Sequence, residues 1–245
     1  VTGGTVTAKD GAFNTYAANS GTITLDGVTL NTEPKSLAFY TTDGGKINFT
    51  GAQTVANIKG GADANSRGTA FLYKGAGATY TPFTPTAVGQ WAKDNFKDAT
   101  GNSTLNKLTL NMEQGSRLFI AQNVAMDLTG TAPGGIATAL GANITGSTDY
   151  KTFMLYLSKL SLDNDINLDD PTDAYNKLEI SNSTIENQNS KTITGTSAGQ
   201  VAIAQENDTT LDRDKVKLVN SGTINLSGAN STAIYGKFAE IKNDT

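Results

Sequence analysis

The chain has 245 residues, with 26 Gly, 5 Pro, no Cys, no His and a formal net charge of -4. Without Cys it has no disulfide or thiolate metal site, and without His it has no Ser-His-Asp triad and no histidine-ligated zinc. The mild acidity, with a pI of about 4.9, argues against nucleic acid as a partner, because nucleic acid selects clustered Lys and Arg.

The first strand that the pattern predicts lies in a nine-residue unit that occurs twice. Residues 19–27 read NSGTITLDG, and residues 220–228 read NSGTINLSG. Each copy alternates apolar and polar residues, and Gly stands near both ends of the strand. The same short strand, with the same turns, thus occurs near both ends of the chain. Such a repeat indicates a solenoid of stacked units.

Further strands are predicted by alternating or apolar runs that lie between Gly, Asn and Ser. The predicted strands cover residues 22–25, 37–40, 46–49, 70–73, 107–110, 118–120, 153–156, 177–180, 215–218, 223–226 and 233–235. Three strand types recur in a fixed order, one of which carries aromatic residues, and this order is typical of the coil of a parallel β-helix. We expect five apolar side chains to point inward: Ile23, Leu25, Ile224, Leu226 and Ile234.

The sequence therefore predicts an all-β fold, a parallel β-helix with inserted loops, built by residues 1–245 as a single segment. The alternative is a β-sandwich or an antiparallel barrel in which the strands resemble one another by chance. Two-residue hairpin turns would favour that alternative, and only residues 25–28 and 42–45 suggest them. The chain begins without Met and ends just after a predicted strand, so we expect it to be part of a longer protein.

Two insertions are predicted where the strand pattern breaks, at about residues 80–104 and 162–175. The first contains Trp91 and Phe96 at helix-like spacing and is expected to form a short helix. An insertion can carry aromatic side chains away from a regular rod, so Phe83, Trp91 and Phe96 are the candidate ligand-binding residues. The alternative for Trp91 is packing against the rod, because a helical apolar stripe normally packs.

The aromatic strands carry eight further rings, at matching positions of successive coils. They are Phe39, Tyr40, Phe71, Tyr73, Phe119, Phe153, Tyr156 and Tyr235. An internal stack is the favoured interpretation, because every second residue of a strand points inward, and an external glycan platform is the alternative.

The second insertion is acidic, with five Asp residues between 163 and 173. Its start resembles a calcium-binding loop, but Leu168 stands where that loop needs Gly and no Glu closes it. A solvated loop is the favoured interpretation, and a weak calcium site is the alternative. The region 206–214 is a second acidic group, read as an exposed bend. We predict no metal site and no cofactor.

Residues 220–244 resemble the repeat of Gram-negative type V autotransporter passengers, most of all those of the large fusobacterial outer-membrane adhesins. The similarity is weaker over residues 19–51 and 177–184. The resemblance implies a right-handed β-helix exported to the cell surface and anchored in the outer membrane by a C-terminal barrel that lies outside this sequence. It implies adhesion to a host-cell glycoprotein or glycan, or to a partner bacterium, and it identifies no binding residues.

Two main functional classes follow from the sequence, besides a phage or S-layer structural fibre, which shares the fold but would usually need trimer-forming or calcium-rich repeats. The first is a non-enzymatic, adhesive surface rod, whose insertions are its contact sites. The second is a β-helical polysaccharide lyase or hydrolase, which would need paired carboxylates or calcium-bound acids with a Lys or Arg base. The lack of His and of convincing carboxylate pairs favours the first.

Overall fold

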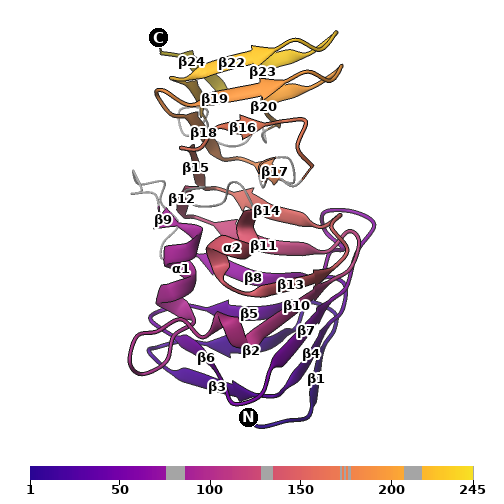
Figure 1. The fold of residues 1–245 in the computed structure, drawn as a ribbon, viewed down its shortest axis with the longest axis vertical. Coiled ribbons are helices and arrows are strands. Elements are labelled where there is room, and N and C mark those ends of the chain that lie inside the picture. The colour runs from indigo at the N-terminus through magenta and orange to yellow at the C-terminus, as the bar shows by residue number, and fades with distance from the viewer. Residues whose placement is uncertain are drawn as a thin grey trace.

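The computed structural model describes residues 1–75, 86–127, 135–171, 173, 175, 178–206 and 217–244. Within this part of the chain, the strands form eight successive coils of three strands, stacked along one axis with the chain ends at opposite ends of the rod (Figure 1). All ladders between these strands are parallel. The predicted parallel solenoid is confirmed, and the sandwich or antiparallel barrel is wrong.

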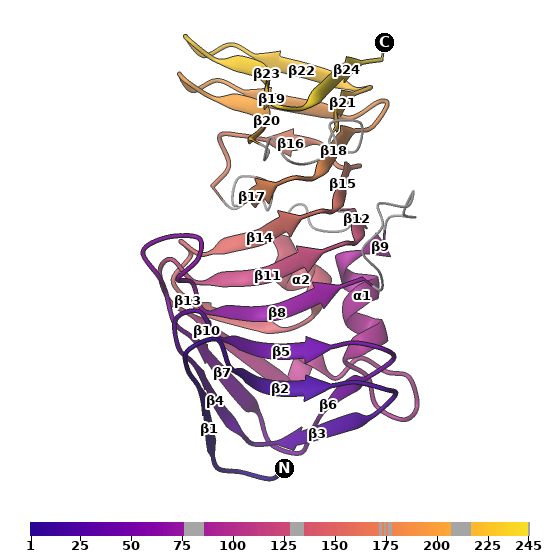
Figure 2. The same ribbon diagram turned by 180° about the vertical axis from the view of Figure 1, so that it is seen from behind.

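The coils have three faces, which we name face 1, face 2 and face 3 after the order of their strands in each coil. Face 2 is one sheet to which every coil contributes a strand, and it faces the viewer in Figure 2. Its strands are β2 (Phe13–Ala17), β5 (Leu37–Thr41), β8 (Thr69–Lys74), β11 (Arg117–Gln122), β14 (Lys151–Tyr156), β17 (Leu178–Ser181), β20 (Val201–Glu206) and β23 (Thr232–Lys237).

Faces 1 and 3 are each divided into two sheets. Face 1 consists of β1 (Thr5–Ala8), β4 (Thr29–Thr32), β7 (Thr54–Ile58), β10 (Leu108–Met112) and β13 (Asn143–Gly146), followed by β16 (Ile166–Asn167), β19 (Thr192–Gly195) and β22 (Thr223–Leu226). Face 3 consists of β3 (Thr22–Asp26) and β6 (Lys46–Thr50), followed by β9 (Thr86–Ala87), β12 (Ala125–Asp127), β15 (Lys159–Leu162), β18 (Thr184–Asn187), β21 (Lys217–Asn220) and β24 (Glu240–Asn243).

Each strand range predicted from the sequence overlaps an observed strand, with residues 177, 215 and 216 outside the described part. β10 starts one residue later than predicted, because Leu105–Lys107 form a turn of 3-10 helix. The two copies of the nine-residue unit lie on different faces, since β3 belongs to face 3 and β22 to face 1. The prediction that strand types recur in one fixed order is therefore wrong for this unit, which specifies a strand and its turns but no particular face.

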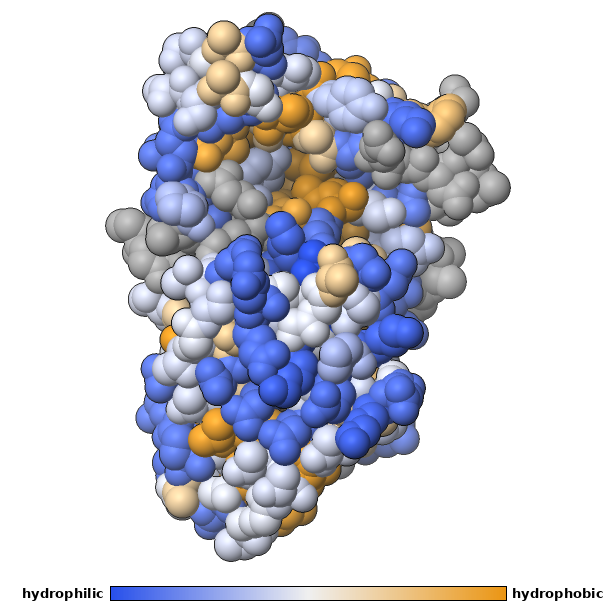
Figure 3. Space-filling view, turned by 90° about the vertical axis from the view of Figure 1, so that its right-hand side faces the viewer, coloured by the Kyte–Doolittle hydropathy of each residue, from blue (hydrophilic) through white to orange (hydrophobic). Residues whose placement is uncertain are grey.

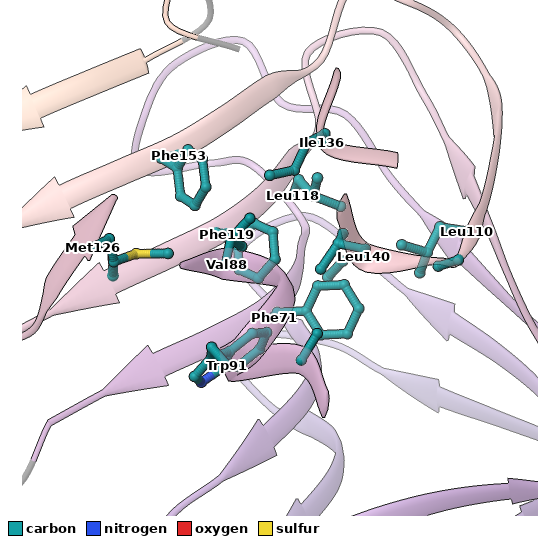
Figure 4. Packing of buried hydrophobic residues seen from close by; sticks show 14 of the residues in the cluster. Phe71, Val88, Trp91, Leu110, Leu118, Phe119, Met126, Ile136, Leu140 and Phe153 are labelled. Atoms are coloured by element: carbon teal, nitrogen blue, oxygen red, sulfur yellow. The ribbon is translucent and has the colours of Figure 1, made fainter. Parts of the chain in front are cut away.

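The core is a column of phenylalanine rings behind face 2. Phe39, Phe71, Phe119 and Phe153 occupy the same position in consecutive strands, and their ring centroids are 5.4, 5.1 and 5.0 Å apart. All four are buried, and three of them are seen in Figure 4. Their nearly parallel rings stack as the parallel strands do, so the internal stack is the correct interpretation for these four residues.

The five side chains predicted to point inward all pack in or against this core. Leu25 is fully buried, whereas the other four are partly exposed. Those four lie in β3, β22 and β23, in the first and last coils, where one side of each strand has no neighbour within the described residues. The prediction is confirmed, with less burial at the ends of the stack.

The helix α1 (Val88–Asn95) closes the gap in face 3 between β6 and β9. The backbone N–H of Phe49 in β6, which has no further strand beside it, donates to Oγ1 of Thr104 at 3.1 Å. The helix α2 (Gly135–Leu140) packs on α1, and a Cβ on Gly89 would stand 2.6 Å from the carbonyl oxygen of Ala139. The short helix predicted in the first insertion is confirmed.

The second predicted insertion, residues 162–175, contains part of a coil. β16 lies inside it and pairs with β19, with Ile166 beside Ile193 and Asn167 beside Thr194. Ile166 is buried in the core. The surrounding Asp residues obscure the alternating pattern of β16 in the sequence. The predicted insertion is therefore wrong at this point, because residues 166–167 form a short strand of the coil that is followed by a bend.

Candidate functional site

Two of the three candidate ligand-binding residues are buried. Trp91 is 3% exposed and Phe96 is 1% exposed. Trp91 packs edge-on against Phe71 and Phe119, with ring centroids 5.8 and 5.2 Å apart (Figure 4). The prediction that the insertion carries these rings away from the rod is wrong, because α1 fills the gap between β6 and β9 and turns its apolar stripe inward. Phe83 lies outside the described residues.

Aromatic rings do reach the surface at the N-terminal end of face 2. Phe13 and Tyr16 are 50% and 51% exposed. Tyr16 stacks on Tyr40 of the next coil with ring centroids 4.9 Å apart, and Phe13 lies 5.6 Å from Tyr40. The rings contact one another along the rod, so this cluster is an outward counterpart of the internal stack.

Asp169, in the acidic stretch 163–173, holds the bend of the following coil. Its carboxylate accepts hydrogen bonds from the backbone N–H and the hydroxyl group of both Thr196 and Ser197, at 2.6 to 3.1 Å, and from Nε2 of Gln200 at 2.8 Å. The Ser197 hydroxyl and then the Thr196 N–H hold the pKa of Asp169 well below its ordinary value. This carboxylate therefore has a structural role.

Two further carboxylates of the stretch also bind backbone groups. Asp165 accepts from the N–H of Thr192 at 2.9 Å, and Asp173 accepts from the N–H groups of Asn167 and Tyr175 at 3.2 and 3.0 Å. Burial raises the pKa of Asp173. Among the described residues, no group of three or more Asp, Glu, His or Cys is placed to hold a metal ion. Residues 207–214 of the second acidic group lie outside the described part.

A shallow groove on face 3 contains the side chains closest to those required by a polysaccharide-cleaving enzyme. It is lined by Asp127, Lys159, Ser161, Asp163, Glu186 and Gln188. Lys159 and Glu186 form an ion pair in it. The candidate base is thus held by one of the candidate acids, and a substrate would have to separate them.

A loop that we call the strap, residues 59–68, joins β7 to β8 and extends along the edge between faces 1 and 2. In Figure 2 it rises on the left to the level of β14. It covers Arg117, which is only 2% exposed and donates from Nη2 to the carbonyl oxygen of Ala64 at 2.7 Å. The strap therefore spans coils that follow its own in the sequence.

Arg67, at the end of the strap, shares one carboxylate with Arg117. Nε of Arg67 lies 3.0 Å from Oε1 of Glu179, and Nη2 of Arg117 lies 2.6 Å from Oε2. The side chains are 12%, 3% and 18% exposed, in the order Arg67, Arg117 and Glu179. Burial lowers the pKa of Arg117, and the hydrogen bond with Glu179 opposes this effect. Three charged groups from well-separated parts of the chain thus form one largely buried network.

The sequence carries a signal for this network that the sequence analysis missed. The chain has only three Arg residues, and two of them follow Ser directly before an aromatic strand, as S66-R67 and S116-R117. The partner Glu179 is 112 residues from Arg67 and 62 from Arg117. Spacing along the chain cannot reveal such a contact, because it depends on the path of the strap.

Beside the strap lies a second shallow groove, at the edge where three consecutive coils bend. It is lined by Gly61, Ala62, Arg67, Gln114, Gly115, Asp149 and Lys151. The N–H of Gly61 donates to the carbonyl oxygen of Gly115 at 3.2 Å, and the N–H of Gly115 donates to that of Asp149 at 2.8 Å. This ladder fixes the lining residues relative to one another, so the groove is preformed.

Comparison of the chain with protein-family models, curated proteins and solved structures found no match. In the part of the chain that the structure describes, no helix has the length and apolar character needed to cross a bilayer.

Proposed function

We propose that this chain is a non-enzymatic segment of a cell-surface adhesin, a right-handed parallel β-helix exported as part of a type V autotransporter passenger. Its partners would be a host-cell glycoprotein or glycan, or the surface of a partner bacterium. A C-terminal barrel outside this sequence would anchor it in the outer membrane. The handedness, the export and the anchor are supported by the resemblance in residues 220–244.

The observation that carries the proposal is the division of the rod into a continuous internal stack and an irregular outer edge. The phenylalanine column and the eight-stranded sheet hold the coils in register. The strap and the preformed groove lie along one edge of this scaffold, between faces 1 and 2. A solenoid of this kind offers a long lateral surface for contact with another large molecule.

The surface on the strap side suits a polar partner. Figure 3 views this side of the rod, and the half nearer the N-terminus is mostly hydrophilic. A polar surface with loops along one edge favours recognition of a polar partner such as a glycan or glycoprotein.

The test is adherence of beads that carry the folded chain to epithelial cells and to bacteria of co-aggregating species. We expect adherence that the soluble chain inhibits in a concentration-dependent manner. Beads that carry heat-denatured chain are the control. Equal binding by folded and denatured chain, or binding to neither cells nor bacteria, would overturn the proposal.

The groove on face 3 defines the test of the enzymatic alternative. The chain is incubated with neutral and acidic polysaccharides, and new reducing ends or unsaturated products are measured. Product release that Lys159→Ala and Glu186→Gln both abolish would replace the adhesin proposal with a lyase or hydrolase.

A further inference from the structure

We propose that the groove beside the strap binds an acidic sugar unit, with Arg67 and Lys151 on the carboxylate and Asp149 and Gln114 on neighbouring hydroxyl groups. This inference names a ligand class for the proposed adhesin and rests on that function for its biological setting. The binding itself is a property of the groove that can be measured separately.

The first argument is the charge of the arginine pair. Glu179 is the carboxylate that both guanidinium groups contact, and each of its oxygens is occupied by an arginine. The other hydrogen bonds of the pair go to neutral carbonyl oxygens. With Lys151 and Asp149, which also line the groove, this edge carries three cations and two anions, so an additional anion can be stabilised there.

Free donors face the same groove. Nη2 of Arg67 has no hydrogen-bond partner within the described residues, and neither has the side chain of Lys151. Lys151 stands directly beside Arg117 in the register of β11 and β14, and Lys151 and Arg67 both line the groove. A guanidinium and an ammonium group in the same lining provide the charge-assisted donors that a carboxylate needs.

The acidic residue in the lining favours a sugar over a simple anion. Asp149 accepts from Nε2 of Gln114 at 3.0 Å, and both residues are exposed. A simple anion such as sulfate would be repelled by the carboxylate of Asp149. A sugar acid carries hydroxyl groups next to its own carboxylate, and these can donate to Asp149.

The floor of the groove is backbone. A Cβ on Gly115 would stand 2.8 Å from the carbonyl oxygen of Gly61, and a Cβ on Gly61 would stand 2.3 Å from that of Ser66. Ala62 is the only lining side chain without a polar group. A flat polar ring can lie on such a floor, whereas a peptide would find no apolar pocket for an anchoring side chain.

The experiment measures binding of N-acetylneuraminic acid and glucuronic acid to the folded chain by calorimetry and by amide chemical shifts in NMR. Galactose and inorganic sulfate are the comparison ligands. We expect at least one sugar acid to bind and to shift amides at residues 61–62 and 114–115, and the comparison ligands to bind at least tenfold more weakly. Sugar acids that shift no amides there would overturn the proposal.

Two variants test the assigned contacts. Lys151→Ala should weaken binding about tenfold, because it removes one charge-assisted hydrogen bond. Lys191→Ala, at a partly exposed lysine before β19, should leave binding unchanged. Asp149→Ala should also weaken binding of the sugar acid. If it instead strengthens binding, the groove is a nonspecific anion site and the proposal fails.

Cell adherence separates this inference from the proposed function. Folded chain that adheres to cells but binds neither sugar acid would refute the sugar site and leave the adhesin in place. If the chain binds the sugar acid but adheres to no cell, the sugar-binding site is supported and the adhesin function is refuted.

Discussion

Asn187 donates a hydrogen bond from Nδ2 to Oδ1 of Asn220 in the next coil, at 2.8 Å. Asn220 repeats the contact with Asn243, also at 2.8 Å. The three residues share one register position of face 3, which Leu162 occupies in the coil before them. The amide group suits such a column because it is donor and acceptor at once. The column starts with an unpaired atom, since Oδ1 of Asn187 is buried and has no partner in the described part of the chain.

Asn220→Ala should lower the free energy of unfolding by about 1–3 kcal/mol, because it leaves Nδ2 of the buried Asn187 without an acceptor. Urea denaturation followed by circular dichroism measures this change. Asn225→Ala, at an exposed position of β22, is the control. The double change of Asn187 and Asn220 to Leu extends the column from Leu162 and should be less harmful. Equal stability of Asn220→Ala and Asn225→Ala would contradict the prediction.

Glu179→Gln should lower the free energy of unfolding by about 3–5 kcal/mol, because both arginines would then be buried without a counter-charge. Glu113→Gln is the matched control, since Glu113 forms an ion pair with Lys59 in which the side chains are 48% and 40% exposed. That change should have an effect of less than about 1 kcal/mol. Both are measured by denaturant titration, and similar losses in the two variants would show that the network stabilises no more than a surface pair.

Trp91 is the single Trp of the chain and reports directly on the packing of α1. We expect blue-shifted emission and weak quenching by acrylamide, because the ring is enclosed by phenylalanine rings. Trp91→Ala should lower the free energy of unfolding by about 3–5 kcal/mol through the cavity it leaves. Lys93→Ala, on the exposed side of the same helix, should have little effect. Emission like that of a fully hydrated indole would mean that α1 is not docked.

Asp169 makes the stability dependent on pH, with a definite sign. Its pKa is held low in the folded state, whereas an Asp in the unfolded chain has a pKa of about 3.9. Its contribution is therefore present above about pH 4 and is lost as the pH falls toward the folded-state pKa. The melting temperature of Asp169→Asn should lie below that of the parent at pH 7, and the difference should shrink between about pH 4 and pH 2.

The control for this pH series is Asp10→Asn, at an exposed bend of the first coil. Asp10 makes no side-chain hydrogen bond to a neighbouring coil within the described residues. Its change should leave the melting temperature close to that of the parent across the pH range. A difference for Asp169→Asn that stays constant down to pH 2 would assign its effect to something other than the carboxylate charge.

The strands of face 2 are readable from the sequence because one inward register position carries a large apolar residue in most of them, as Phe71, Phe153 and Ile203 do. β5 and β8 read LAFYT and TAFLYK, and the ring column is visible in the residue types alone. The strands of face 1 are harder to recognise. β4 and β19 read TLNT and TITG, with Thr or Gly at inward positions, so their alternation emerges only when the register of neighbouring coils is known.

The candidate site could not be predicted to the same extent. The apolar stripe of a helix that contains Trp91 can be recognised in the sequence. Its spacing does not show whether the stripe packs into a gap of the β-helix or faces a binding partner, because both cases have the same spacing. The groove beside the strap brings together bends of three coils, and its lining residues are separated by up to 90 positions, from Gly61 to Lys151. Only the stacking of the coils brings these residues to one edge.

The strap also changes how the rod comes apart. In a solenoid each coil contacts only its neighbours, so unravelling can proceed from an end one coil at a time. Arg67 precedes β8 in the third coil, and Glu179 lies on β17 in the sixth. Detaching the sixth coil must break this link, which also holds down the strap over the fourth and fifth. Unfolding from the C-terminal end would therefore remove the last two coils one at a time and then slow down. Removing the sixth coil also breaks the ion pairs that hold the strap, so the third to sixth coils are destabilised together.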